Sequence, residues 1–372
     1  MEIERKILLN PGPATTTDTV KLAQVVPDIC PREAEFTELM ASLRRDLLRI
    51  VHAKDDYTAV LFCGSGTINL DVAINSLVSA KGKILFVNNG AYTRRGVEIA
   101  KAYNLPFVEL RYPENELPNL AEVKAALAAD PLLEMVYTTH NETGTGILNP
   151  IRQIGELAHA YGAKFVVDTT STYAMLPIDV YKDNVDFCMA SAQKGLMAMT
   201  GLSFIIGKKA IIEESQDYPK RSYYCNLYQQ YANFEKNGEM QFTPPVQTIY
   251  AAVQGIKEYF QEGEAAKYLR HLDTFVTLRD GMARLGFKEL IKREWQAGLV
   301  LAVEYPQDPH WDFAKIHDYL YERGITIYPG KVSDIPSFRL CSLGAITPKD
   351  AEYFLEVLQT ALEHYQIKIP VE

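Results

Sequence analysis

Lys194 stands in an unusual environment for a lysine. It lies in the stretch SAQKGLMAMTG (residues 191–201), among small and apolar residues, directly after the apolar run VDFCMA (185–190). A lysine is rarely buried unless its charge or its amine has a task. Apolar surroundings disfavour the ammonium form, and the neutral amine is a nucleophile toward carbonyl groups. The sequence therefore predicts a lysine that forms a Schiff base with a carbonyl compound.

Asp168 is the expected partner of this lysine. It ends the apolar run AKFVVD (163–168) and precedes Lys194 by 26 residues, which is about the length of one crossover helix plus one strand. The two side chains are therefore expected in one crevice. If the carbonyl belongs to pyridoxal 5′-phosphate, the carboxylate can keep the pyridine nitrogen protonated and make the ring an electron sink. The alternative for Asp168 is a helix N-cap or a loop charge.

Two further motifs could complete a cofactor pocket. The apolar run at residues 58–63 ends in GSGT (64–67) and leads directly into a helical pattern, so the positive end of that helix faces any anion placed there. Two hydroxyls and two glycines suit a phosphate, although such a turn can also be a simple strand-to-helix connection. Tyr92, in NNGAYTRR (88–95), could stack on the face of the cofactor ring or be a rim residue of the core.

The elements that must position these residues alternate between strands and helices. Short apolar runs separated by helical periodicity are typical of a mostly parallel sheet that helices cover on both faces. In such a doubly wound α/β sheet, ligands collect beyond the carboxyl ends of the strands, where Asp168 and Lys194 lie. We expect strands at residues 58–64, 83–90, 106–110, 134–140, 163–170, 186–192 and 202–207, and helices near 67–78, 93–103, 119–129 and 151–161.

The chain is expected to divide into an arm and two domains. Residues 1–20 include LLNPGPATTT and match neither a helix nor a strand, so we expect an arm that crosses the surface or reaches toward a partner subunit. Residues 21–263 are expected to form the large cofactor-binding domain, and residues 264–372 a smaller α+β domain. The last helix has a clear start signal, with Thr347 as N-cap followed by a proline.

Composition limits the kinds of partner. The 372 residues are 47% hydrophobic, enough for two cores, and 38 Lys and Arg against 47 Asp and Glu give a net charge of −9. Since no basic block stands out, we expect small-molecule partners and neither nucleic acid nor a membrane surface. The five cysteines lack the CxxC spacing of redox or metal sites. No apolar run has the length of a membrane span, and the charged N-terminus is unlike a signal peptide. These features predict a cytoplasmic protein with free thiols and no metal centre.

Taken together, the motifs resemble those of class V aminotransferases, members of the fold type I superfamily of pyridoxal phosphate enzymes. The similarity covers nearly the whole chain and is closest to 2-aminoethylphosphonate:pyruvate transaminases. It rests on the order and spacing of nine motifs: LLNPGP, GSGT, NNGAY, HNETGTGILNP, VVDTTSTY, SAQKG, FTPPVQT, YPGK and SFRLCSLG. It implies a homodimer with active sites at the subunit interface, with Lys194 bonded to the cofactor, Asp168 beside the ring nitrogen and Tyr92 stacked on the ring. Residues implied near the cofactor phosphate are Ser65, Gly66, Thr67 and Gln193.

The resemblance implies three more site residues, each with a structural alternative. Thr143 would lie near the phenolic oxygen of the cofactor, and Thr243 would reach the phosphate of the neighbouring subunit's cofactor, although threonines beside glycine-rich loops often cap turns. Arg339 resembles the arginine that holds the substrate carboxylate, a task for which its planar guanidinium is suited. Its alternative is an ion pair at a strand edge.

The implied reaction is reversible transamination, in which 2-aminoethylphosphonate and pyruvate give phosphonoacetaldehyde and L-alanine. Lys194 would be the base that moves a proton between the substrate carbon and the cofactor. Alanine:glyoxylate or serine:pyruvate transamination stays open because it would use the same cofactor residues; a PLP-binding protein without catalysis is a more distant alternative. Candidates for additional phosphonate contacts are Arg32, Arg94, Lys331 and Thr15 to Thr17.

Overall fold

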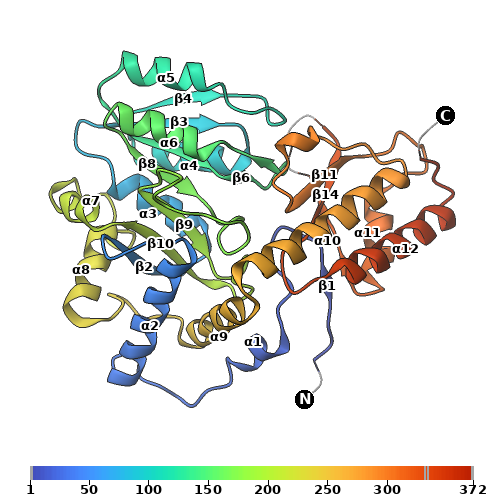
Figure 1. The fold of residues 1–372 in the computed structure, drawn as a ribbon, viewed down its shortest axis with the longest axis horizontal. Helices are drawn as coiled ribbons and strands as arrows, with labels where there is room; N and C mark the ends of the chain where they lie inside the picture. The colour runs from blue at the N-terminus through green and yellow to red at the C-terminus, as the bar shows by residue number, and fades with distance from the viewer. Residues whose placement is uncertain (1–2, 331, 333–334, 370–372) are drawn as a thin grey trace.

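Seven strands form one sheet in the larger part of the molecule (Figure 1). In sheet order they are β2 (Tyr57–Gly64), β10 (Gly201–Lys208), β9 (Phe187–Ser191), β8 (Lys164–Asp168), β5 (Leu133–Thr139), β3 (Lys83–Asn88) and β4 (Phe107–Arg111). The computed structural model describes residues 3–330, 332 and 335–369. All strands of this sheet are parallel except β10, which lies antiparallel between β2 and β9. The predicted mostly parallel α/β sheet is confirmed.

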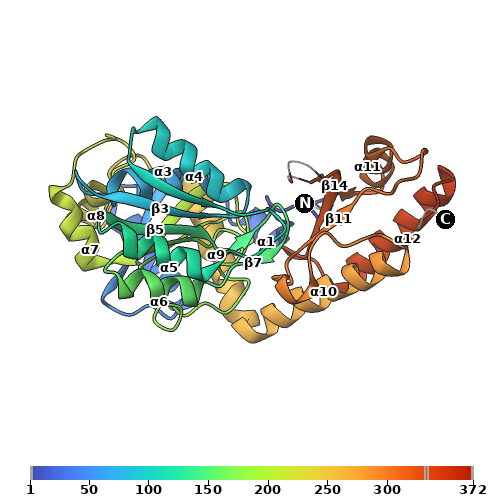
Figure 2. The same ribbon diagram turned by 90° about the horizontal axis from the view of Figure 1, so that it is seen from above.

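Helices cover both faces of this sheet. They are α2 (Ala34–Ile50), α3 (Thr67–Ser76), α4 (Ala91–Ala102), α5 (Leu120–Ala129), α6 (Ile151–Ala160), α7 (Lys209–Glu214), α8 (Leu227–Asn237) and α9 (Val246–Glu262). α3 and α4 contact each other over one face, and α5 and α6 over the other (Figure 2). Because both faces are covered, every residue of β9 is buried, which explains its unbroken apolar sequence.

The order of the strands brings the two key residues together. β8 and β9 are parallel neighbours, and Asp168 is the last residue of β8. β9 and β10 are antiparallel neighbours, so the chain between them makes only a short connection, residues 192–200, and Lys194 lies in it. Both side chains therefore start from the same edge of the sheet, at the carboxyl ends of the parallel strands.

The C-terminal part has its own sheet and its own core. Its elements are α10 (Glu264–Arg284), β11 (Val300–Glu304), α11 (Phe313–Tyr321), β12 (Ile325–Thr326), β13 (Tyr328–Pro329), β14 (Ser337–Cys341) and α12 (Pro348–His364). β14 lies antiparallel between β11 and β13, and the helices pack around them. The predicted start of the last helix is confirmed by a capping box between Thr347 and Asp350. The predicted boundary at residue 263 falls between α9 and α10.

The N-terminal arm differs from the expected surface segment. Ile7–Leu8 form a short strand, β1, parallel to β12, and Leu9 is fully buried. Farther along, the N–H of Ala14 donates to the carbonyl of Gln193 at 2.9 Å. The arm therefore passes between the C-terminal part and the Lys194 connection. The expectation that the arm contains no strand was wrong, because two residues are too few to show the alternation of a strand. A contact of the arm with a partner subunit stays a prediction. The remaining short elements are α1 (Asp18–Leu22), β6 (Asn141–Glu142), β7 (Ile147–Leu148) and the 3-10 turns Ser215–Asp217 and Arg293–Trp295.

Candidate active site

One cavity of about 220 Å³ lies where the sheet, the arm and the C-terminal part meet. Its walls come from segments far apart in the sequence, which is typical of a site at the carboxyl edge of a parallel sheet. The residues that line it are Pro11, Gly12, Ser65, Gly66, Thr67, Leu70, Tyr92, Arg95, Asp168, Thr170, Gln193, Lys194, Tyr328 and Arg339. Eight of the predicted site residues are in this set, so the structure brings them together; their roles stay predictions.

Lys194 lies on one side of this cavity with 8% of its surface exposed. Its Nζ is 5.3 Å from the centroid of the Tyr92 ring. Gly12 of the arm lies against the lysine stem: a Cβ at this position would be 3.0 Å from Cγ of Lys194, and the φ of +123° also favours glycine. Glycine at this position therefore lets the arm pass close to the lysine side chain.

Asp168 and the GSGT turn line the same cavity. One carboxylate oxygen of Asp168 accepts a hydrogen bond of 2.9 Å from the N–H of Thr170. Two buried hydroxyls near the start of α3, those of Thr170 and Ser191, have no hydrogen-bond partner among the described residues. A Cβ at Gly66 would lie 3.3 Å from each of these side chains. Buried polar atoms are nearly always paired, so these hydroxyls indicate a place for a polar ligand.

Arg339 is a buried cation that also lines the cavity. It is 1% exposed, and its guanidinium donates to the carbonyls of Pro329 (3.1 Å) and Thr143 (2.8 Å). Among the described residues, no carboxylate is paired with it. A buried guanidinium is costly without a negative partner, and carbonyl oxygens carry no full charge. The arrangement favours an anionic ligand.

Arg95 is a cavity residue that the sequence reasoning missed. Its Nη1 donates to the hydroxyl of Thr67 at 2.9 Å, and its guanidinium lies 5.2 Å from the centroid of the Tyr92 ring. Arg94, the predicted candidate, instead pairs with Glu114 at 2.6 Å and does not line the cavity. Helical spacing could have distinguished them, because residues three apart share a helix face and residues two apart do not.

The other candidates for phosphonate contacts lie elsewhere. Arg32 pairs with Glu239 at 2.7 Å, the hydroxyl of Thr15 accepts from the N–H of Leu8, and the hydroxyl of Thr17 caps α1. Neither these residues nor Thr16 lines the cavity of their own chain, so a phosphonate contact from them stays a prediction. Position 331, the remaining lysine candidate, lies outside the described residues.

The two predicted threonines also lie outside the cavity lining. Thr143 is buried and contributes its carbonyl to Arg339, a backbone contact that sequence reasoning did not foresee. Thr243 is exposed. A role for its hydroxyl toward a second subunit stays a prediction.

Two titratable groups of the HNETGTG motif are buried behind the cavity. Burial raises the pKa of Glu142 to about 7; its carboxylate accepts from the N–H groups of Tyr92 (3.2 Å) and Gly144 (3.0 Å). Glu142 therefore links the start of α4 to the loop that holds Arg339. Burial lowers the pKa of His140 to about 4, so its ring is neutral at physiological pH.

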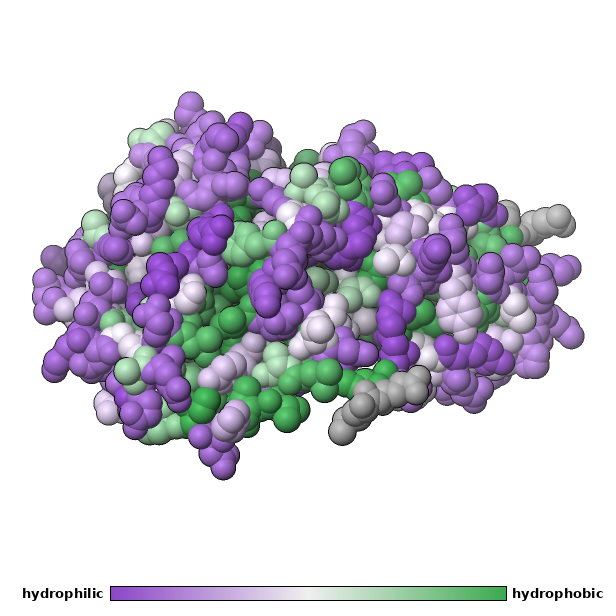
Figure 3. All heavy atoms as spheres, turned by 60° about the horizontal axis from the view of Figure 1, so that its bottom comes forward, coloured by the Kyte–Doolittle hydropathy of each residue, from purple (hydrophilic) through white to green (hydrophobic). Residues whose placement is uncertain are grey.

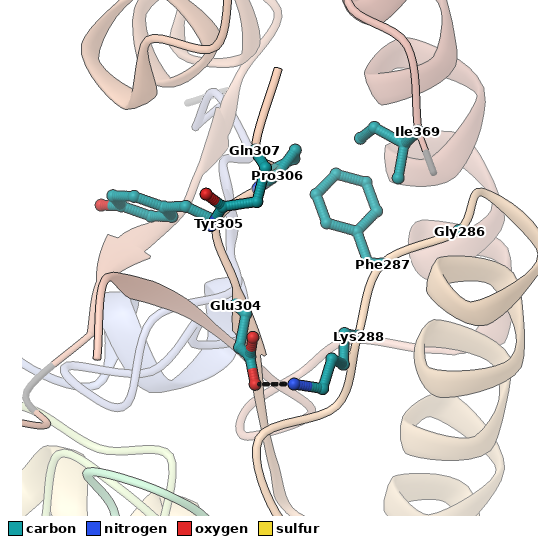
Figure 4. Close-up of a pocket in the computed structure, with 8 residues that line it drawn as sticks. All are labelled: Gly286, Phe287, Lys288, Glu304, Tyr305, Pro306, Gln307 and Ile369. Atoms are coloured by element: carbon teal, nitrogen blue, oxygen red, sulfur yellow. Dashed lines mark ion pairs between the residues drawn. The ribbon is translucent and has the colours of Figure 1, made fainter. Parts of the chain in front are cut away.

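A second cavity, of about 270 Å³, lies in the C-terminal part and does not include any of these residues (Figure 4). It is bordered by Phe287, Pro306 and Ile369, with the ion pair of Lys288 and Glu304 (2.7 Å) at one side. Within the described ranges, no group of three or more His, Cys, Asp or Glu is placed to hold a metal ion.

Comparisons with known proteins agree with this geometry. The family model "Aminotransferase class-V" matches residues 20–348. A 2-aminoethylphosphonate–pyruvate transaminase from Vibrio vulnificus is 35% identical, covering 96% of this chain and 97% of its own, and one from Polaromonas sp. is 34% identical, covering 96% of both. The crystal structure of an alanine–glyoxylate aminotransferase from Nostoc sp. has a TM-score of 0.89 at 23% identity, covering 97% and 96% of the two chains, and so shares the fold. The chain therefore belongs to the class V aminotransferases, a family of enzymes that use pyridoxal 5′-phosphate.

Proposed function

We propose that the chain catalyses reversible transamination between 2-aminoethylphosphonate and pyruvate, giving phosphonoacetaldehyde and L-alanine. The observation that carries the proposal is the similarity to transaminases named for these substrates, which extends over 96% of this chain at 34–35% identity. Alanine:glyoxylate and serine:pyruvate transamination are the alternatives, because they would use the same cofactor residues.

The charges of the cavity support the proposal. Three cations line it, Lys194, Arg95 and Arg339, against one carboxylate, Asp168. A bound cofactor phosphate at the GSGT turn would take up part of this positive charge. Arg339, which has no carboxylate partner in the described part of the chain, stays available for a substrate anion, and a guanidinium binds carboxylates and phosphonates alike.

The residues of the cavity fit pyridoxal phosphate. The unpaired hydroxyls of Thr170 and Ser191 lie beside Gly66 at the start of α3, where N–H groups and the helix dipole favour a phosphate. Gln193 lines the same cavity; its buried Oε1 is unpaired and can only accept, whereas its Nε2 group could donate to a phosphate. Asp168 would face the ring nitrogen and Tyr92 one face of the ring. When bound, the cofactor supplies an aldehyde that bonds to amines and a ring that withdraws electrons from the substrate carbon.

The chain's own groups would do the remaining work. Lys194 Nζ would hold the cofactor before the donor amine replaces it, and would then accept the proton from the substrate carbon and return it at the next step. Arg339 would fix the substrate anion, which orients the reacting carbon toward that amine. Arg95, close to Thr67, would add a positive charge near the phosphate end.

A comparison of donors tests the substrate assignment. We measure the first half-reaction of the cofactor-loaded enzyme without an acceptor, because alanine with pyruvate gives no net change. We expect kcat/KM for 2-aminoethylphosphonate to exceed the values for alanine, serine and taurine by at least about 100-fold, since a phosphonate dianion can make more charge-assisted contacts than the singly charged anions of these donors. Arg339→Gln should lower kcat/KM for 2-aminoethylphosphonate and for alanine by roughly 10- to 100-fold, while Arg323→Gln, an exposed arginine, serves as the control. A wild-type preference for alanine with glyoxylate, or for serine, would favour an alternative instead.

A homodimer is part of the same proposal. Two groups of apolar side chains are unusually exposed in the single chain: Val25 (82%) with Leu22 (46%), and Tyr223 (83%) with Tyr224 (42%). The side of the molecule with α1 and the connection to α2 carries apolar areas among charged side chains (Figure 3). Tyr224 stacks on Phe242, directly before the exposed Thr243, which supports a subunit contact near this threonine.

The dimer can be tested by substitution. We expect the wild-type chain to have the mass of a dimer at micromolar concentration, and Tyr223→Asp to weaken the dimer by about 30-fold or more, because an interface aromatic contributes about 2 kcal/mol and a charge replaces it. Tyr321→Asp, at a tyrosine 54% exposed on α11, is the matched control. Light scattering across a dilution series measures both. A monomeric wild-type protein would contradict the proposal.

We expect a cytoplasmic location. In the part of the chain that the structure describes, no helix is long and apolar enough to cross a membrane. The five cysteines are unpaired, which suits a reducing compartment.

A further inference from the structure

Lys267 is a buried lysine to which the proposed reaction gives no role. It lies in the first turn of α10, is 1% exposed, and its Nζ donates a hydrogen bond of 2.5 Å to the carbonyl oxygen of Gly195. The same Nζ lies 5.1 Å from the centroid of the Tyr259 ring. One peptide bond joins Gly195 to Lys194. The buried ammonium therefore bonds directly to the residue next to the reactive lysine.

No carboxylate bonds to this ammonium among the described residues. Glu262 pairs with Arg270 at 2.6 Å, and Glu258 accepts hydrogen bonds from threonines of the arm. Burial lowers the pKa of Lys267 to about 7; Arg270 lowers it further, whereas Glu262 and Glu258 oppose the shift. A buried cation without a close partner costs stability, and an apolar side chain would pack there at less cost. The lysine is therefore best explained by the carbonyl that it holds.

The peptide after Lys194 has little space to move. A Cβ at Gly195 would lie 1.9 Å from the carbonyl oxygen of Tyr173, and a Cβ at Gly255 of α9 would lie 2.4 Å from that of Leu196. Backbone thus approaches this connection from two sides. Lys267 adds a directional hydrogen bond from α10, which both the neutral amine and the ammonium can donate.

α10 is also fixed to the segment that follows Arg339. His271 Nδ1 donates to the carbonyl of Ser342 at 2.6 Å, and Arg270 Nη1 donates to the carbonyl of Gly344 at 3.0 Å. The His271 ring is neutral, because burial and the nearby cations hold its pKa well below the ordinary value. The C-terminal side of the cavity is therefore tied to the same helix.

We call Lys267, Arg270 and His271 the α10 anchor. Lys267 and His271 are four residues apart, so they lie about 6 Å apart along one face of the helix. α10 extends from the large part to the C-terminal part (Figure 2). One rigid face therefore contacts both the connection that carries Lys194 and the segment just after the strand that carries Arg339.

We propose that Lys267 is a positioning residue: through the carbonyl of Gly195, it fixes Lys194 relative to the anion-binding Arg339, with α10 as the rigid link. The inference rests on the proposed role of Lys194 and extends it to a residue outside the cavity lining. Without this bond, the amine of Lys194 would lose alignment with the carbon of a substrate held by Arg339. Misplacement by about 1 Å can reduce a reaction rate by up to about 100-fold.

Lys267→Met tests the proposal, because methionine has a similar length but cannot donate. We expect the variant to fold with unchanged or greater stability, to attach pyridoxal phosphate to Lys194 more slowly, and to lose about 10- to 100-fold in kcat with KM for pyruvate changed less than about threefold. Lys267→Arg should recover part of the loss, and Lys257→Met, at an exposed lysine of α9, is the control. Attachment is followed by the absorbance of the lysine-bound cofactor without substrate, so its outcome does not depend on the substrate assignment.

Stability against pH gives a second readout. The pKa of Lys267 is about 7 in the folded chain and about 10.5 when unfolded, so the unfolded chain binds more protons between these values. The free energy of unfolding contributed by this group should rise with pH over that window, and Lys267→Met should lack the rise. If Lys267→Met does not fold, Lys267→Gln replaces it. Wild-type attachment and turnover in a folded variant would overturn the proposal.

Discussion

Lys194→Ala should abolish transamination, with a loss of at least about 10³-fold in kcat for 2-aminoethylphosphonate with pyruvate. The variant loses the amine that bonds to the cofactor and also the base that moves the proton, and each function contributes by a large factor. The fold should persist, because the side chain lies in the cavity and not in the apolar core. A small loss in stability is expected where the lysine stem contacts Gly12.

The covalent bond distinguishes this expectation from simple loss of binding. After reduction with borohydride and digestion, the wild-type protein should carry the cofactor on the peptide that contains Lys194, and Lys194→Ala should carry none. Lys315→Ala, at an exposed lysine of α11, controls for loss of charge. If another lysine of the Lys194→Ala protein carries the cofactor, the assignment of Lys194 as the attachment site is wrong.

Asp168→Asn should keep the cofactor bound but lower kcat by about 100-fold. Asparagine can still accept the hydrogen bond from Thr170, so the local backbone should not change. It cannot hold a proton on the ring nitrogen by charge, and a charge-assisted hydrogen bond is worth about 1.5–3 kcal/mol.

A cofactor methylated at its ring nitrogen provides the matching control, because its positive charge does not depend on a carboxylate. With this cofactor, kcat of Asp168→Asn should be at least about tenfold higher than with the normal cofactor, whereas kcat of the wild-type enzyme should not rise. A variant as active as the wild type with the normal cofactor would show that Asp168 has no such role.

Much of the fold could be predicted from the sequence, because a strand buried on both faces has a nearly continuous apolar sequence. Strands such as β3 and β9 contain runs of four apolar residues, ILFV and FCMA, and helical patterns separate such runs along the chain, so the parallel sheet could be predicted. The pairing of β1 with β12 could not, since it joins two-residue segments at opposite ends of the chain. Such contacts leave no local periodicity in either segment.

Residues of the candidate site could be predicted where the expected chemistry requires a particular residue type. Lys194 and Asp168 stand out because charged side chains rarely end an apolar strand, or follow one closely among small and apolar residues, without a task. Contacts made by backbone atoms could not be foreseen, as with the carbonyl of Thr143 that holds Arg339. Arg95 was missed because its neighbour Arg94 is the same residue type, and only the helix face separates them.

The burial of Lys267 and its contact with Gly195 could not be predicted for another reason. In the sequence it is one of several charged residues in a long helix, and nothing in the spacing marks it as buried. Its contact with Gly195 depends on how α10 crosses the end of the large sheet, which only tertiary packing determines.

The path of the arm has a consequence for the way this enzyme is made. Ile7 pairs with Ile325, 318 positions farther along the chain. At about 5–20 residues per second, a ribosome needs roughly 15 to 60 s to synthesise that interval, and the arm must wait for its partner strand during this time. Pro11 and Pro13 disfavour pairing of the arm with another strand during this interval, because proline has no N–H group to donate a hydrogen bond to a neighbouring strand. Tyr328 and Arg339, which line the cavity together with Gly12 and Lys194, also follow β12 in the chain, so a nascent chain lacks a complete cavity until these residues have been synthesised.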